Sequence, residues 1–190
     1  EPIGAAEKLM AAYEVGAREA EVLLAAAEHY LEGGAPQEAQ AAFTRVVEEH
    51  GGSMPAIEAQ IGWARAAREL GDIEGAFTRL EDLASANAGS PGLLPVLQEL
   101  ADVYRELGLT GEMIETYGRV AGISDEPAPL AEAARALIEA GAADEGLQVA
   151  ARVDASRLDA PQAYAFLQAW GRTLLRGNPD EAMTLLMRAH

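Results

Sequence analysis

The chain has 190 residues, no cysteine and a formal net charge of −17 at pH 7. Without cysteine it forms no disulfide bond and no thiolate metal site, and no apolar run in the sequence is long enough to span a bilayer. The negative charge argues against a nucleic acid partner, because phosphate binding needs a basic face, but it leaves cationic partners open. Aromatic residues make up 5% of a sequence otherwise rich in alanine, leucine and glutamate, which favours helix throughout.

The first predicted element is one amphipathic helix over residues 2–14, followed by Gly16 as a left-handed residue just past its end. Read as half of a hairpin, this helix would have a partner before residue 1. We therefore expect residues 1–16 to be the second helix of a truncated preceding unit, and the chain to be part of a longer or processed protein.

Five helical hairpins are predicted to follow, each with a glycine at the turn between its two helices. Serine, aspartate and asparagine side chains are placed to cap several of these helices, at Ser53, Asp72, Ser90 and Asn178. The second helix of the fourth hairpin, over residues 143–153, is short. The hairpins span residues 17–52, 53–89, 90–124, 125–158 and 159–190.

The turn glycines recur at nearly constant intervals of 37, 37, 33 and 36 residues. Self-similarity at a period of a few tens of residues is typical of a solenoid, in which each unit packs on its neighbours. The turn glycines are Gly34, Gly71, Gly108, Gly141 and Gly177.

The residues around these glycines resemble the tetratricopeptide repeat. Small residues such as Ala27, Ala64 and Ala101 lie where the two helices of a repeat would touch, and Tyr30 and Tyr104 lie late in the first helix. The resemblance implies an all-α fold, a right-handed α-solenoid of antiparallel helix hairpins. The sequence departs from the family pattern in two ways: its period is 37 rather than 34 residues, and it lacks the tryptophan that the family has early in the repeat. A sel1-like or pentatricopeptide array also fits the period, although the acidity argues against the RNA binding of the latter.

Proteins of this family bind peptides or partner domains on a concave face built mainly from the first helix of each repeat. Placed on that pattern, the chain shows a ladder of glutamates, each two residues before a turn glycine, and a ladder of arginines along the same face. One interpretation is a charged groove in which arginine grips carboxylates. The other is that the ladders pair with each other as solvated ion pairs. The predicted partner-binding residues are Glu28, Glu32, Arg65, Arg68, Glu69, Asp102, Arg105, Glu106, Glu132, Arg135 and Glu139.

No residue pattern predicts catalysis, a cofactor or a metal site. His29, His50 and His190 stand apart from any ligand or nucleophile spacing, and Trp63 and Trp170 are predicted to fill the core. A clamp for acidic C-terminal tails is disfavoured, because the chain has one lysine, outside the repeats, and Glu28 where the family's clamp has asparagine.

The sequence therefore predicts a non-catalytic scaffold that holds a protein or peptide partner. An alternative keeps the fold and places it in the periplasmic part of a bacterial exopolysaccharide export machine, docking a modifying enzyme and guiding a cationic polysaccharide. Self-assembly through the end helices, or a role as the accessory domain of an enzyme, also stays open. The sequence favours the periplasm over the cytoplasm and predicts no membrane insertion of this segment.

Overall fold

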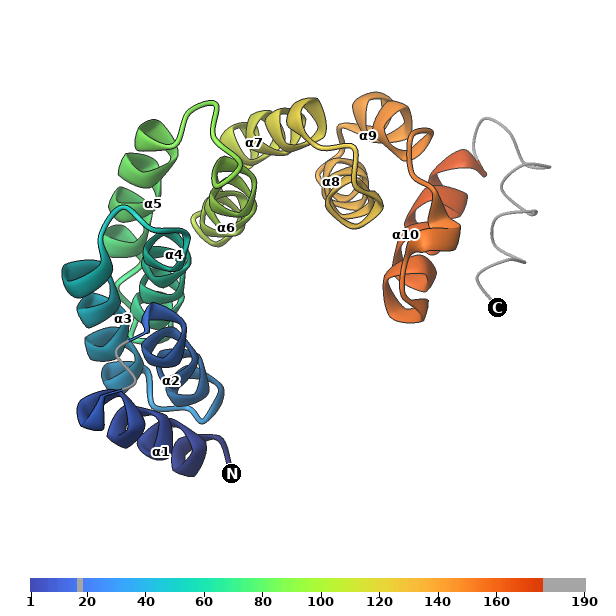
Figure 1. Cartoon of the computed structure of the whole chain (residues 1–190). Coiled ribbons are helices and arrows are strands. Elements are labelled where there is room, and N and C mark those ends of the chain that lie inside the picture. Colours follow the sequence, from blue (N-terminus) through green and yellow to red (C-terminus); the bar gives the residue numbers. More distant parts are fainter. Residues whose placement is uncertain (17–18, 176–190) are drawn as a thin grey trace. The chain divides into compact units, whose positions relative to one another are not determined.

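The computed structural model describes residues 1–16 and 19–175, which form α-helices and one short 3-10 helix and, within those ranges, no strand (Figure 1). The predicted all-α class is confirmed. Gly177, the Asn178 cap, the second helix of the fifth hairpin and His190 lie outside the described residues. The helices are α1 (Pro2–Val15), α2 (Ala20–Glu32), α3 (Pro36–His50), α4 (Met54–Glu69), α5 (Ile73–Ala86), α6 (Leu93–Glu106), α7 (Thr110–Ile123), α8 (Pro127–Glu139), α9 (Ala143–Ala150), η1 (Ala155–Arg157) and α10 (Ala160–Leu174).

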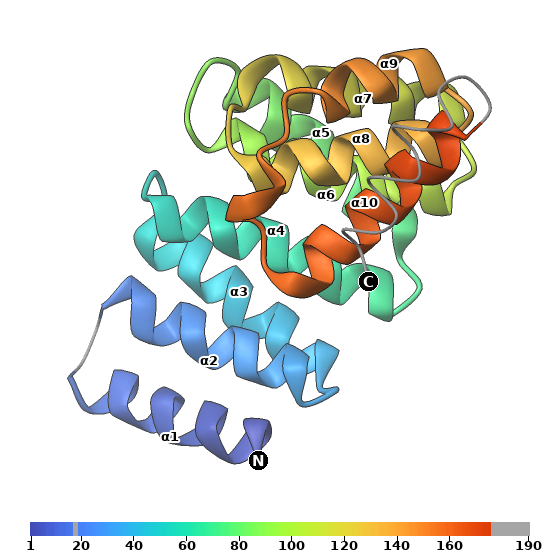
Figure 2. The ribbon, with the colours of Figure 1, turned by 90° about the vertical axis from the view of Figure 1, so that its right-hand side faces the viewer.

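The chain divides into two compact units, Glu1–Glu99 and Leu100–His190, with the division inside α6. In the first unit each helix from α1 to α4 packs on the next one along the chain, and α2 also contacts α4. Figure 2 shows α1, α2 and α3 side by side with alternating directions. Because α3 packs on both α2 and α4, and α2 also contacts α4, the helices α2 and α4 lie side by side in one layer and α3 lies in a second layer.

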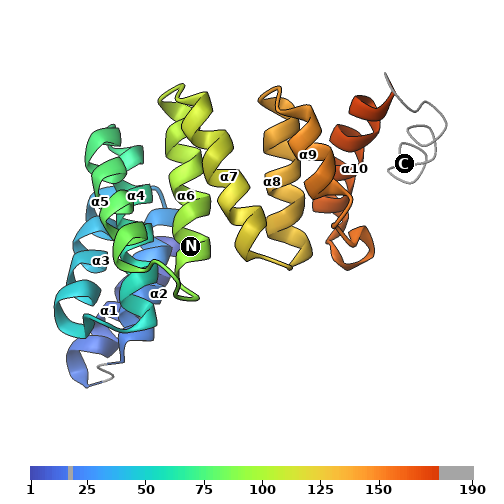
Figure 3. The same cartoon turned by 90° about the horizontal axis from the view of Figure 1, so that it is seen from above.

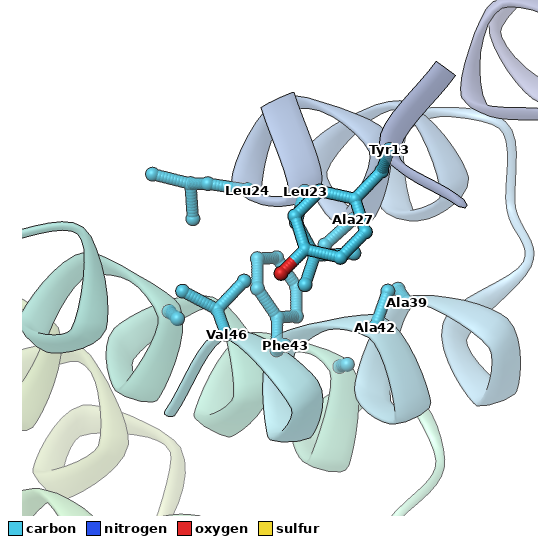
Figure 4. Packing of buried hydrophobic residues seen from close by; sticks show 10 residues of the cluster. Tyr13, Leu23, Leu24, Ala27, Ala39, Ala42, Phe43 and Val46 are labelled. Atoms are coloured by element: carbon cyan, nitrogen blue, oxygen red, sulfur yellow. The ribbon is translucent and has the colours of Figure 1, made fainter. Parts of the chain in front are cut away.

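The core of the first unit is built from a few large side chains set among alanines (Figure 4). Tyr13 and Phe43 are each 1% exposed, and Leu23 and Val46 are completely buried. The small side chains let neighbouring helix backbones approach closely, while the large ones fill the remaining space. The alanines of this cluster are Ala27, Ala39, Ala42, Ala59 and Ala66.

Gly62 of α4 lies in close contact with Phe43 of α3. A Cβ atom added at this buried glycine would lie 2.3 Å from Cζ of Phe43, well inside van der Waals contact. The missing side chain of Gly62 therefore makes the space that the Phe43 ring occupies.

The turn glycines end the first helices as predicted. Gly34, Gly71, Gly108 and Gly141 have φ values of 72°, 85°, 70° and 91°, in the left-handed region where a Cβ atom is strained. The backbone N–H of the residue after each glycine reaches back into the helix; for example, Asp72 N donates to the carbonyl of Ala67 at 2.9 Å. One closing geometry therefore serves four successive hairpins.

Two of the predicted caps are confirmed and one is wrong. The Ser53 hydroxyl accepts from the N–H of Ala56, and the Asp72 carboxylate accepts from the N–H of Gly75 at 2.9 Å. Ser90 does not cap α6, because that helix begins three residues later. The Ser90 carbonyl instead accepts from the N–H of Leu93 at 3.1 Å, which makes the intervening segment a turn.

In the second unit α8 packs against α7, α9 and α10, and Figure 3 shows it lying between α7 and α10. The helix predicted over residues 143–153 is shorter than expected and ends at Ala150. The Asp154 carboxylate accepts from the N–H of Ser156 and starts η1, which competes with continuation of α9. Arg152, just past α9, donates to the carbonyl oxygens of Ala121 at 2.6 Å and Ser124 at 3.0 Å.

Candidate functional site

A groove of about 380 Å³ lies between α2 and α4 in the first unit, with the start of α6 at its edge. It is called the α2–α4 groove below. Its floor is apolar and its rim is charged, and three of the predicted partner-binding residues line it: Glu28, Glu32 and Arg65. The complete lining is Glu28, Leu31, Glu32, Phe43, Glu58, Ile61, Gly62, Arg65 and Pro95.

Three carboxylates stand on the rim of the α2–α4 groove, and they influence one another. The pKa of Glu28 is raised above its usual value, first because the side chain is partly buried and then because Glu58 and Glu32 lie nearby. Arg65 acts in the opposite direction and lowers this pKa. The repeat pattern also places Glu58 on this face, 30 residues after Glu28, although it is not among the eleven predicted partner-binding residues. The groove is consequently a site of negative potential.

The two arginines of α4 are held by a buried carboxylate. Glu99 is 5% exposed, and it accepts from Nε of Arg65 at 2.6 Å and from Nη1 of Arg68. Sequence reasoning missed Glu99, because in the repeat pattern it lies beside the polar residues expected on the surface. The sequence did contain a signal for this contact. Glu99 lies on the first helix of the next hairpin, about one repeat period after Arg65 and Arg68. Arg65 and Arg68 therefore already bind a carboxylate of the same chain.

The second unit places the remaining predicted residues in local pairs. Arg105 donates to the Asp102 carboxylate and, at 2.7 Å, to the hydroxyl of the buried Tyr117. Burial, followed by the charges of Asp102 and Glu132, raises the pKa of Tyr117 to about 12. Arg135 pairs with Glu139 one turn later at 2.9 Å.

The rest of the glutamate ladder is close to solvent. Glu32 contacts Nδ1 of His29 at 3.0 Å, and Glu69 and Glu106 are exposed. Glu132, which is outside the ladder, is half-buried. The predicted arginines pair with carboxylates, but of the ion pairs named above for the described residues only that of Arg135 with Glu139 joins the two ladders, and it lies within one helix. Arg65 and Arg68 find their carboxylate at Glu99, a residue outside the predicted glutamate ladder.

Trp63 packs against the core, as predicted, and its ring is also covered by a cation. The guanidinium carbon of Arg79 lies 4.2 Å from the ring centroid, and burial lowers the pKa of Arg79. The two residues line a shallow depression beside α4 and α5. Trp170 lies against Phe166, with ring centroids 5.3 Å apart.

Within residues 1–16 and 19–175, no three histidine, aspartate or glutamate side chains are grouped so that they could hold a metal ion. No helix in the described part of the chain has the length and apolarity to cross a membrane.

The sequence matches no protein-family model and no curated protein, but solved structures match it over most of its length. A putative kinesin light chain from Podosopora anserina, with nearly identical TPR-like repeats, has a TM-score of 0.67 at 24% identity, covering 89% of this chain and 92% of that one. YrrB, a TPR protein with an unusual peptide-binding site, has a TM-score of 0.61 at 19% identity, covering 97% and 92%. The chain has a tetratricopeptide-repeat fold. BtubC from P. vanneervenii is also similar, with a TM-score of 0.67 at 16% identity over 99% of this chain and 86% of its own.

Proposed function

We propose that this TPR chain is a non-catalytic scaffold that binds a partner protein or peptide on the face built from the first helices of its repeats. The α2–α4 groove carries the proposal, since it joins an apolar floor to charged rim residues that family resemblance had already placed on the binding face. Peptide-binding sites commonly combine these two features. The peptide-binding site named for YrrB, which shares the fold, adds support.

Selection from a library of random peptides, followed by affinity measurement, tests the proposal. We expect the immobilised chain to enrich peptides whose binding is lost when Glu58, on the groove rim, is replaced by arginine. The matched control is Glu48→Arg, since Glu48 is also an exposed glutamate but lies on α3, and this change should leave binding unchanged. Enriched peptides that bind both variants as well as the parent chain would contradict a binding site on the first-helix face.

The exopolysaccharide-export alternative and the periplasmic location rest on sequence acidity and resemblance alone. Both stay predictions. A cationic polysaccharide is therefore included as a competing ligand in the experiment described below.

A further inference from the structure

We propose that the α2–α4 groove selects a partner segment in which an arginine or lysine stands next to an aliphatic side chain. The inference rests on the proposed function and deepens it by naming the chemistry of the ligand. It reverses the expectation that the arginines of this face would grip carboxylates of a partner.

The charge of the rim favours a cation. Glu28, Glu32 and Glu58 contribute three carboxylates to the groove lining, and Arg65 contributes the single guanidinium. The Arg65 side chain is 56% exposed, yet its Nε already donates to the buried Glu99 at 2.6 Å. An incoming carboxylate would face the three rim glutamates and compete with Glu99 for Arg65, whereas an incoming ammonium or guanidinium meets complementary charge.

The floor of the groove favours an aliphatic neighbour for that cation. Ile61 is 4% exposed and Phe43 1% exposed, and Leu31 and Pro95 complete the apolar lining. Gly62 carries no side chain, so the Phe43 ring lies directly against the α4 backbone and forms part of the floor. An aliphatic side chain placed on this floor would cover the half-buried Leu31 and Pro95 and would itself leave water, and the loss of water-exposed apolar surface stabilises the complex.

These two features together distinguish a polypeptide from a cationic polysaccharide. A peptide can present a charged and an aliphatic side chain within a few ångströms of each other. A polymer of amino sugars offers positive charge and hydroxyl groups, but no aliphatic side chain that would use the floor. The volume of about 380 Å³ is at the small end of ligand sites, which are roughly 300–1,000 Å³, and fits one or two side chains.

The test is a selection from displayed random peptides against the whole chain, with the composition of the enriched peptides as its readout. We expect arginine or lysine next to leucine, isoleucine, valine or methionine. In fluorescence anisotropy, the best peptide should bind the Glu28→Gln/Glu58→Gln variant about tenfold more weakly than the parent chain, and binding should weaken with added salt. Glu48→Gln on α3 is the control and should bind normally.

The other possible results separate a failure of the cation preference from a failure of the proposed function. Enrichment of acidic or uncharged peptides that still require the α2–α4 groove would overturn the cation preference and leave the proposed function standing. Enrichment of no peptide would count against both. Oligomers of chitosan serve as the polysaccharide probe, and binding equal to that of the best peptide, with the same loss in the double variant, would overturn the choice of a peptide ligand.

Discussion

The carboxylate of Glu99 accepts a hydrogen bond from Nε of Arg65 at 2.6 Å, across 34 residues of sequence. Since Arg65 belongs to α4 and Glu99 to α6, this bond joins the first helices of two successive hairpins. Arg68, 18% exposed, adds a second bond to the same carboxylate. A buried charge with two cationic partners is a fixed part of the fold, whereas an isolated pair at the surface contributes little.

Glu99→Gln should therefore destabilise the chain. The amide keeps the shape of the side chain but loses the charge that the partly buried Arg68 and Arg65 both contact. We expect the free energy of unfolding to fall by about 2 kcal/mol in urea titrations, less than for a fully buried pair because Arg65 is half exposed. Glu69→Gln, at an exposed position on the same helix as the two arginines, is the control and should change it by less than about 0.5 kcal/mol. If both substitutions lower the free energy of unfolding equally, the buried contact of Glu99 with the two arginines does not stabilise the fold.

Gly62→Ala should destabilise the chain because the new methyl group meets the Phe43 ring. We expect a loss of about 2 kcal/mol in the free energy of unfolding, as is usual for overpacking a core. Gly118→Ala is the matched control, since Gly118 is exposed on α7 and a Cβ atom there meets nothing within 4 Å. There, alanine should stabilise the helix by about 0.5–1 kcal/mol. If Phe43→Leu in the Gly62→Ala background restores no stability, the clash is not the cause.

Gly71→Ala should destabilise the chain for a different reason, the φ of 85° at the turn between α4 and α5. The space around Gly71 is open, so the cost comes from the backbone alone. We expect about 1–2 kcal/mol, and a smaller loss for Gly71→Asn, because asparagine tolerates the left-handed region better than alanine. Thermal and urea unfolding of the two variants measure the difference, and a larger loss for asparagine would contradict this account.

Glu28→Gln should slightly stabilise the chain near neutral pH. The raised pKa means that the folded chain holds the Glu28 proton more tightly than the unfolded chain does. The stability that this proton contributes is complete below the ordinary value of 4.5 and is lost as the pH rises through the folded pKa. We expect a gain below about 0.5 kcal/mol at about pH 7 that disappears at about pH 4, measured by urea unfolding. A gain that persists at the lower pH would assign the effect to something other than charge.

Tyr117 should ionise unusually late. With its pKa raised from 10.0 to about 12, the stability linked to its proton is complete below pH 10.0 and is lost as the pH rises through about 12. The near-ultraviolet titration of the parent chain, minus that of Tyr117→Phe, should isolate one tyrosine with this late midpoint. Circular dichroism followed in parallel shows whether the chain is still folded. A midpoint near 10 in the folded chain would contradict the prediction.

Much of the fold could be predicted because the features that decide it are local. Gly71 and its counterparts, the caps at Ser53 and Asp72, and the helical spacing of apolar residues each depend on a few consecutive positions. The prediction failed at Ser90, where serine before proline is typical of a cap but also suits the turn that the chain makes. It failed again at the end of α9, where Asp154 begins a new turn.

The candidate site was harder to predict because its chemistry depends on contacts between helices. The repeat pattern placed Glu28, Glu32 and Arg65 on one face but could not show that Glu99 would be buried and would take Arg65 and Arg68 as partners. Nor could it show that the Phe43 ring would lie against Gly62 and form part of the floor of the groove. Both features depend on the distance between packed helices, which the order of residues along one helix does not contain.

The shared geometry at Gly34, Gly71, Gly108 and Gly141 has a consequence for how such a chain can grow. Because each of these hairpins closes through the same turn, an extra copy of one segment, such as residues 53–89, would offer its neighbours surfaces that they already accommodate. Tandem duplication within the gene would then add a hairpin without redesigning the ones beside it, and rim residues such as Glu58 would be free to diverge in the new copy.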